Sequence, residues 1–214
     1  MVTAMQASLP MIVASLMAPP AGWLTAKLVS HYADDAPSPR WPVTIPLTLA
    51  IVIWAALARL PVPVFWASLG LGWALACLAI IDLAALRLPD VLTLPLLASG
   101  LLMSAFLPGR PIADHLAGAA IGYGALAALA WAYEKARGRE GVGLGDAKLL
   151  GAAGAWLGWR DLPSVVLIAC AAAFLWVGVL AIARGRAALR DPLAFGVPLC
   201  LAVWIVWLYG PLAV

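Results

Sequence analysis

The chain is a series of long apolar runs separated by short polar connections. A hydrocarbon core of about 30 Å is crossed by a helix of roughly 20 apolar residues, whereas the strands of a membrane barrel alternate apolar and polar positions. The pattern therefore predicts an all-α polytopic membrane protein with about eight transmembrane helices. The predicted spans are 8–29, 44–60, 63–82, 91–107, 113–133, 146–159, 163–183 and 192–212.

Two of these runs differ from a simple span. The first contains Pro19-Pro20, which predicts a kink or two half-helices. The sixth is short and rich in Ala and Gly, which favours packing among other helices over contact with lipid. The composition agrees with a bilayer protein, because 65% of the residues are hydrophobic and 11% are charged, too few to cover a water-facing surface.

Basic residues are concentrated in alternate connections, and this predicts the orientation of the chain. With the N-terminus outside, ten basic residues lie in the inner connections and three in the outer ones, as the positive-inside rule expects. The inner connections are 27–43, 83–90, 134–148 and 184–191. The net charge of +3 is explained in this way, and we expect a lipid bilayer and no nucleic acid as partner.

Acidic residues are scarce, so their positions are informative. Asp82 ends the third predicted span and Asp146 opens the sixth, which places both carboxylates at the cytoplasmic end of a helix. Carboxylates near a bilayer core usually face the bundle interior or a wet cavity. Two that approach closely share one proton, and such a pair can activate water and polarise a peptide carbonyl without a metal. At each position a structural cap remains the alternative interpretation.

The residues around the two acids add further candidates. Glycines at 141, 143 and 145 precede or flank Asp146, and we expect them to permit unusual backbone dihedrals and close approach of a substrate strand. Lys148 either balances charge near Asp146 or anchors the helix at the cytoplasmic face. Pro89 halts the backbone after the third span, and Asp90 suits the N-cap of the fourth, a structural role.

These stretches resemble the bacterial type IV prepilin peptidases, a family of GxGD-type intramembrane aspartic proteases. The resemblance covers residues 70–214. It is carried by Ile81-Asp82 with LPD at 88–90 and VLTLPLL at 91–97, by EGVGLGDAKL at 140–149 with GAAGAWLGW at 151–159, by Asp114 with GAAIGYG at 118–124, and by PLAFGVP at 192–198.

The resemblance implies a peptidase that removes the basic leader from type IV prepilins or type II secretion pseudopilins. It implies Asp82 and Asp146 as the catalytic pair, with support from Gly143, Gly145, Lys148, Pro89 and Asp90. We expect a single membrane domain over 1–214, with N-terminal spans and a short cytoplasmic loop in 1–62 and the peptidase core in 63–214. The expected location is the bacterial inner membrane, with the active site at the cytoplasmic face.

The sequence departs from the family pattern in two places. Ala84 stands where the family often has a second aspartate, which we interpret as tolerable. The long form of the family has a cysteine-rich cytoplasmic insert linked to methylation of the new N-terminus, whereas the loop at 30–43 contains no cysteine. We therefore expect no cofactor for cleavage, and S-adenosylmethionine only if a methyltransferase activity is retained. No metal site is expected, because Cys77, Cys170 and Cys200 form no CxxC pair.

Three other functions remain as alternatives. A transporter or channel would use Asp82 and Asp146 as ion sites, and an inverted repeat would support it. Presenilin-type and signal-peptide peptidases also use GxGD, but have a tyrosine where this chain has Ile81 and lack the Leu-Pro-Asp sequel. A non-catalytic assembly protein would tolerate loss of either aspartate.

Overall fold

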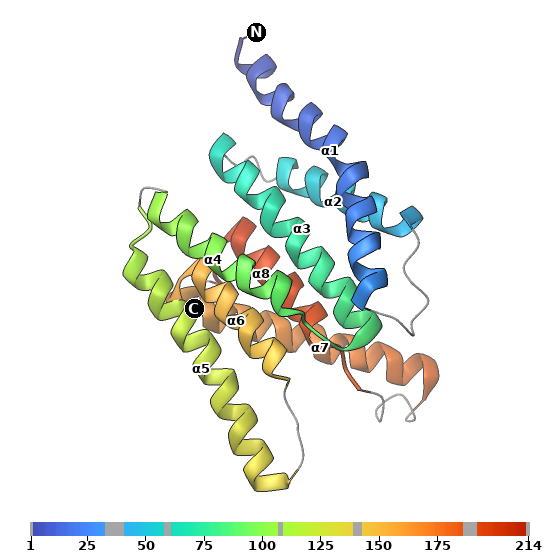
Figure 1. Cartoon of the computed structure of the whole chain (residues 1–214), viewed down its shortest axis with the longest axis vertical. Helices are drawn as coiled ribbons and strands as arrows, with labels where there is room; N and C mark the ends of the chain where they lie inside the picture. Colours follow the sequence, from blue (N-terminus) through green and yellow to red (C-terminus); the bar gives the residue numbers. More distant parts are fainter. Residues whose placement is uncertain are drawn as a thin grey trace. The chain divides into compact units, whose positions relative to one another are not determined.

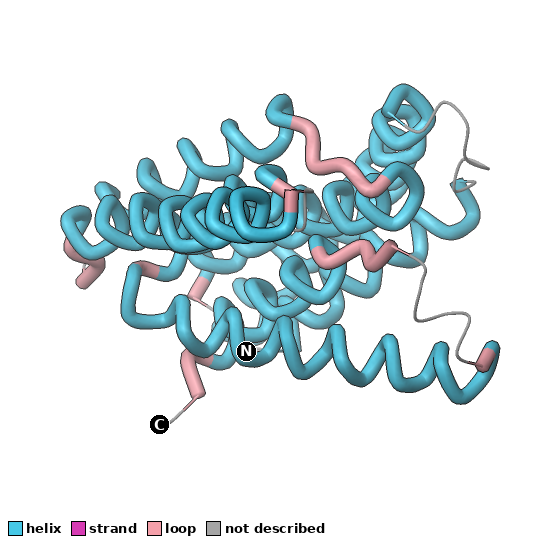
Figure 2. Tube along the Cα trace, turned by 90° about the horizontal axis from the view of Figure 1, so that it is seen from below, coloured by secondary structure: helices cyan, strands magenta, loops and turns pink. Residues whose placement is uncertain are grey.

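The computed structural model describes residues 2–32, 41–57, 61–106, 109–138, 143–185 and 192–212, and most of these residues are helical. The remaining described residues form turns and loops, and no strand occurs in these ranges (Figure 2). The helices are α1 (Val2–Tyr32), α2 (Trp41–Leu57), α3 (Val62–Ala85), α4 (Asp90–Phe106), α5 (Ile112–Arg137), α6 (Leu144–Leu157), the 3₁₀ turn η1 (Trp159–Asp161), α7 (Leu162–Arg184) and α8 (Gly196–Tyr209) (Figure 1).

Each predicted span overlaps one of these helices, and the all-α membrane class is confirmed. Three stretches are long and apolar enough to cross a bilayer by themselves: Val64–Ala85, Ile112–Arg137 and Trp159–Arg184. The number of spans and the outside location of the N-terminus stay predictions. Most of the predicted cytoplasmic loop lies outside the described residues.

Two helix boundaries differ from the sequence pattern. The helix α1 is unbroken through Pro19-Pro20, so the chain does not form two separate half-helices there. The helix α3 extends to Ala85, three residues beyond the predicted end at Asp82. Apolar residues after Asp82 continue the helix, so this acid lies within the last turn and not at the helix end.

The chain divides into two compact units, Met1–Ala85 and Leu86–Val214. In the first unit, α1, α2 and α3 pack on one another through fully buried side chains that include Val29, Ala55 and Leu71. Buried hydroxyl groups donate hydrogen bonds to carbonyls of their own helix, as Ser68 Oγ does to Val64 O at 2.7 Å. The division lies after α3, and the expected single membrane domain stays a prediction.

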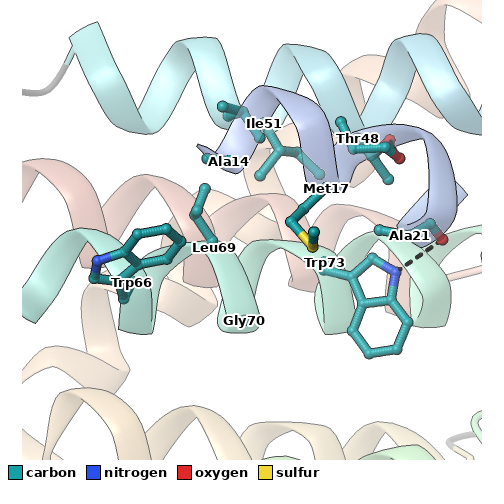
Figure 3. Close-up of a pocket in the computed structure, with 11 residues that line it drawn as sticks. Ala14, Met17, Ala21, Thr48, Ile51, Trp66, Leu69, Gly70 and Trp73 are labelled. Carbon is teal, nitrogen blue, oxygen red and sulfur yellow. Dashed lines mark hydrogen bonds between the residues drawn. The ribbon is translucent and has the colours of Figure 1, made fainter. Parts of the chain in front are cut away.

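A half-open apolar cavity of about 310 Å³ lies between the three helices of the first unit (Figure 3). Trp73 of α3 lies beside it and donates from Nε1 to Thr25 Oγ1 at 3.0 Å and to Ala21 O at 3.3 Å. Thr48 of α2 donates to Ala18 O of α1 at 3.1 Å. These hydrogen bonds join α1 to α2 and to α3.

The second unit is built around the short helix α6, which contacts α4, α5, α7 and α8 (Figure 1). Nine of the ten residues from Ala147 to Trp156 in α6 are buried, and Lys148 is the exception. The prediction that this Ala- and Gly-rich segment packs among other helices is therefore confirmed.

Glycines allow α5 and α6 to approach closely. A Cβ added at Gly122 of α5 would lie 2.5 Å from the Leu150 carbonyl oxygen, and one at Gly154 of α6 would collide with the backbone of Gly118. Neither clash can be relieved by rotating a side chain, because the atoms met are backbone. Gly118 and Gly122 of α5, with Gly151 and Gly154 of α6, therefore form a small-residue interface between the two helices.

Candidate active site

Asp82 lies in the last turn of α3 within the first unit. Its side chain is buried, with 5% of the residue exposed, and the adjacent Ile81 is fully buried. The apolar run before Asp82 forms the helix. Asp82 follows Leu78 by four residues, so both side chains lie on the same buried face of α3. A carboxylate buried at this position requires polar surroundings or a proton.

The residue that follows α3 has an unusual backbone conformation. Leu86, directly after the helix, has a positive φ of 53°. This left-handed conformation is common for glycine at a helix C-terminus and costs a leucine about 1 kcal/mol or more. Four residues after Asp82, the chain is therefore bent by a strained leucine.

Asp146 lies in the first turn of α6 within the second unit and is half-buried. Its backbone N–H donates to Gly143 O at 3.1 Å, which closes the turn that starts the helix. A negative charge in the first turn is stabilised by the exposed N–H groups of the helix. The helix start therefore favours the ionised form of this carboxylate.

The predicted unusual dihedrals at the motif glycines are wrong for the two that the structure describes. Gly143 has φ −68° and ψ 134°, a conformation open to any residue, and Gly145 lies inside α6. Gly145 is needed for space instead, because a Cβ there would lie 3.0 Å from Leu88 Cβ. Gly141 lies outside the described residues.

Asp90 and Lys148 are brought together from positions 58 residues apart. Lys148 Nζ donates to both carboxylate oxygens of Asp90, at 2.6 Å to Oδ1 and 2.9 Å to Oδ2. Asp90 is the first residue of α4, and the carbonyl of Pro89 accepts the first helix amides, from Leu92 and Thr93. The cap therefore falls one residue earlier than predicted, and the Asp90 carboxylate binds Lys148.

The seven predicted site residues are thus divided between the two units. Asp82 belongs to the first unit, and the other six belong to the second. Within the second unit, the segment 88–90 contacts the first turn of α6. The approach of Asp82 to Asp146 stays a prediction.

The far end of α6 carries a polar cluster that the sequence analysis did not identify. Arg110 donates to Trp156 O at 3.0 Å and lies over the Trp207 ring at 4.5 Å, while His115 Nδ1 donates to Ala155 O at 2.9 Å. Burial lowers the pKa of Arg110, an effect that the nearby Asp161 carboxylate opposes. These donors satisfy carbonyls at the C-terminal end of α6, where positive charge is favourable.

Comparison with known proteins places both aspartates in one family segment. The model of the type IV leader peptidase family matches residues 69–179, which include Asp82 and Asp146. The chain is 39% identical to a prepilin leader peptidase/N-methyltransferase of Aeromonas salmonicida over 88% of its own length and 64% of the relative's. It is 40% identical to the protein of the same name from Aeromonas hydrophila, over 81% of this chain and 59% of the relative.

A third relative, from Burkholderia pseudomallei and of the same name, is 45% identical over 61% of this chain and 42% of its own length. The chain therefore spans less than two thirds of the length of these relatives. No solved structure matches the chain significantly.

Proposed function

Because the chain belongs to the type IV leader peptidase family, we propose that it is a membrane aspartic endopeptidase that cleaves the basic leader from type IV prepilins or type II secretion pseudopilins. The observation that carries the proposal is the pair of acids within the matched segment, Asp82 buried in the last turn of α3 and Asp146 in the first turn of α6. Two other acids of the described residues, Asp90 and Asp114, also lie in matching motifs at helix starts, but Asp90 is paired with Lys148 and Asp114 lies at the far end of α5 from Asp146.

The direction of the helices supports a meeting of the two acids. If α3, α4, α5 and α6 each cross the bilayer once, the end of α3 and the start of α6 lie on the same side. The basic residues that flank these helices, Arg87 and Arg137 among them, support a cytoplasmic location for that side. A basic leader would reach an acidic pair at that face.

The chemistry needs one ionised and one protonated carboxylate. When two carboxyl groups share a site, repulsion and desolvation keep one of them protonated. The ionised group takes a proton from water, the water oxygen attacks the scissile carbonyl, and the protonated group donates a hydrogen bond to the carbonyl oxygen. The tetrahedral intermediate then collapses: the peptide C–N bond breaks, and the carboxyl that took the proton from water gives it to the leaving amine. We propose Asp146 as the ionised group, since the helix start favours its charge, and buried Asp82 as the protonated group.

The proposal is restricted to peptide cleavage. The relatives are named as methyltransferases as well, but the loop at 30–43 of this chain has no cysteine. No step is assigned to S-adenosylmethionine. The proposed location is the bacterial inner membrane, with cleavage at its cytoplasmic face.

The test is to incubate the purified protein with a leader-bearing prepilin and to determine the product's N-terminus by mass spectrometry. Asp82→Asn and Asp146→Asn should each abolish cleavage, because neither amide can replace its carboxyl in the proton transfer. The control is Asp114→Asn. Asp114 lies in the first turn of α5, whereas the last turn of α5 precedes α6, so this variant should cleave normally. Processing by either of the first two variants at the wild-type rate would refute the proposed mechanism, and the same spectra report whether the product is methylated when S-adenosylmethionine is added.

A further inference from the structure

The start of α6 is held against the start of α4 at two points, and these points flank Asp146. Gly145 lies against Leu88, and Lys148 is paired with Asp90. The two helices pack on each other, and both begin at this end of the unit. The position of the Asp146 side chain therefore depends on how the segment 88–90 is held.

The lysine is unusual in this place. Lys148 follows Asp146 by two residues near the start of α6, where a positive charge opposes the helix dipole. Asp90 in the first turn of α4 has the favourable sign for its own helix. The lysine is therefore compatible with the helix start because the carboxylate of another helix neutralises it through both oxygens.

The pair is too exposed to be a major source of stability. The side chains of Lys148 and Asp90 are 33% and 53% exposed, and ion pairs in such surroundings add little to folding because water screens them. The contact of the ammonium with both carboxylate oxygens instead restricts the relative position of α4 and α6. A catalytic carboxylate acts efficiently only when its neighbours hold it in a fixed position.

We propose that Asp90 and Lys148 are positioning residues whose ion pair fixes the rotation and depth of the first turn of α6, and with it the Asp146 carboxylate. The inference rests on the proposed peptidase function. It assigns Asp90 an effect on the rate of chemistry, and Lys148 a partner other than Asp146. Neither residue touches the scissile bond in this scheme.

The test is a double-mutant cycle in the full-length purified protein. Asp90→Asn and Lys148→Gln should each lower kcat for prepilin cleavage by about 10- to 100-fold with little change in KM, which is the size of effect that a small misplacement of a catalytic group produces. The double variant should be no slower than the slower single variant, because both substitutions break one interaction. Lys148→Arg, which keeps a charged donor for the carboxylate, should retain most of the activity.

The matched control is Lys135→Gln, which removes an exposed lysine from the end of α5 that precedes the start of α6. It should leave kcat within about twofold of the wild type, because no interaction with α6 is lost. A double variant in which the two single losses multiply, or single variants with unchanged kcat, would overturn the proposal.

Hydrogen–deuterium exchange of the first turn of α6 keeps the inference separate from the proposed function. Asp90→Asn and Lys148→Gln should accelerate exchange of the amides between 144 and 148, while Lys135→Gln should not. An inactive wild-type protein with this exchange pattern would refute the peptidase and retain the restraint on α6. An active wild-type protein, together with variants whose exchange and kcat are unchanged, would retain the peptidase and refute the restraint on α6.

Discussion

The close approach of α5 and α6 leads to a prediction with a control two residues away on the same helix. Gly122→Ala places a methyl group 2.5 Å from Leu150 O, 2.9 Å from Leu150 C and 3.2 Å from Gly151 N, whereas nothing lies within 4 Å of a methyl group at Gly124. The two substitutions therefore add the same atom to α5 with opposite steric consequences.

The magnitude follows from the distances. Ordinary van der Waals contact begins at 3.4 Å, so the helices must separate by about 0.9 Å to admit the Gly122 methyl group. Overpacking of this kind costs typically 1–3 kcal/mol. Gly124→Ala has no such cost and gains up to about 1 kcal/mol of helix propensity, so it should be neutral or stabilising.

The measurement is the unfolding transition of both variants in the same detergent, monitored by tryptophan fluorescence, together with prepilin cleavage. Gly122→Ala should unfold earlier and cleave more slowly, because the displaced α6 carries Asp146. Equal unfolding midpoints for the two variants would show that the helices are not in the close contact described.

Two further predictions concern the far end of α6 and the absence of a metal from the proposed chemistry. Arg110→Gln should lower the free energy of unfolding by about 2 kcal/mol, because it removes a charged hydrogen bond to Trp156 O and the cation over Trp207, and an unchanged unfolding free energy would contradict this account. Treatment of the purified protein with a chelator, followed by the same mass-spectrometric cleavage assay, should leave the rate unchanged, and loss of cleavage that is restored by a divalent metal would contradict the two-carboxylate mechanism.

Helix positions were largely predictable because in a membrane protein the length of an apolar run decides the element. The sequence pattern ends α3 too early, because a polar residue, Asp82, closes the apolar run, whereas the residues after it continue the helix to Ala85. The stop is made by the left-handed Leu86, and leucine gives no signal for that conformation.

The candidate site was predictable only as far as short motifs allow. Counting spans places Asp82 and Asp146 near the end of one helix and the start of another, and the structure has them in the last turn of α3 and the first turn of α6. The contact between Asp90 and Lys148 depends on the rotation of two helices about their axes, which a pattern of apolar runs does not determine. The same limit hid the donors at the far end of α6, although Arg110 was one of only three basic residues assigned to the outer side.

The shortness of α6 has a consequence for the bilayer itself. Its 14 residues rise about 21 Å, some 9 Å less than the thickness of an average hydrocarbon layer. Other helices, namely α4, α5, α7 and α8, contact α6, so its length need not match the length of the acyl chains. The remaining thickness lies beyond the two ends of α6, next to the polar groups there. One end holds a guanidinium and an imidazole, and the other holds a carboxylate, so water can solvate polar groups at both ends of this helix below the level of the headgroups.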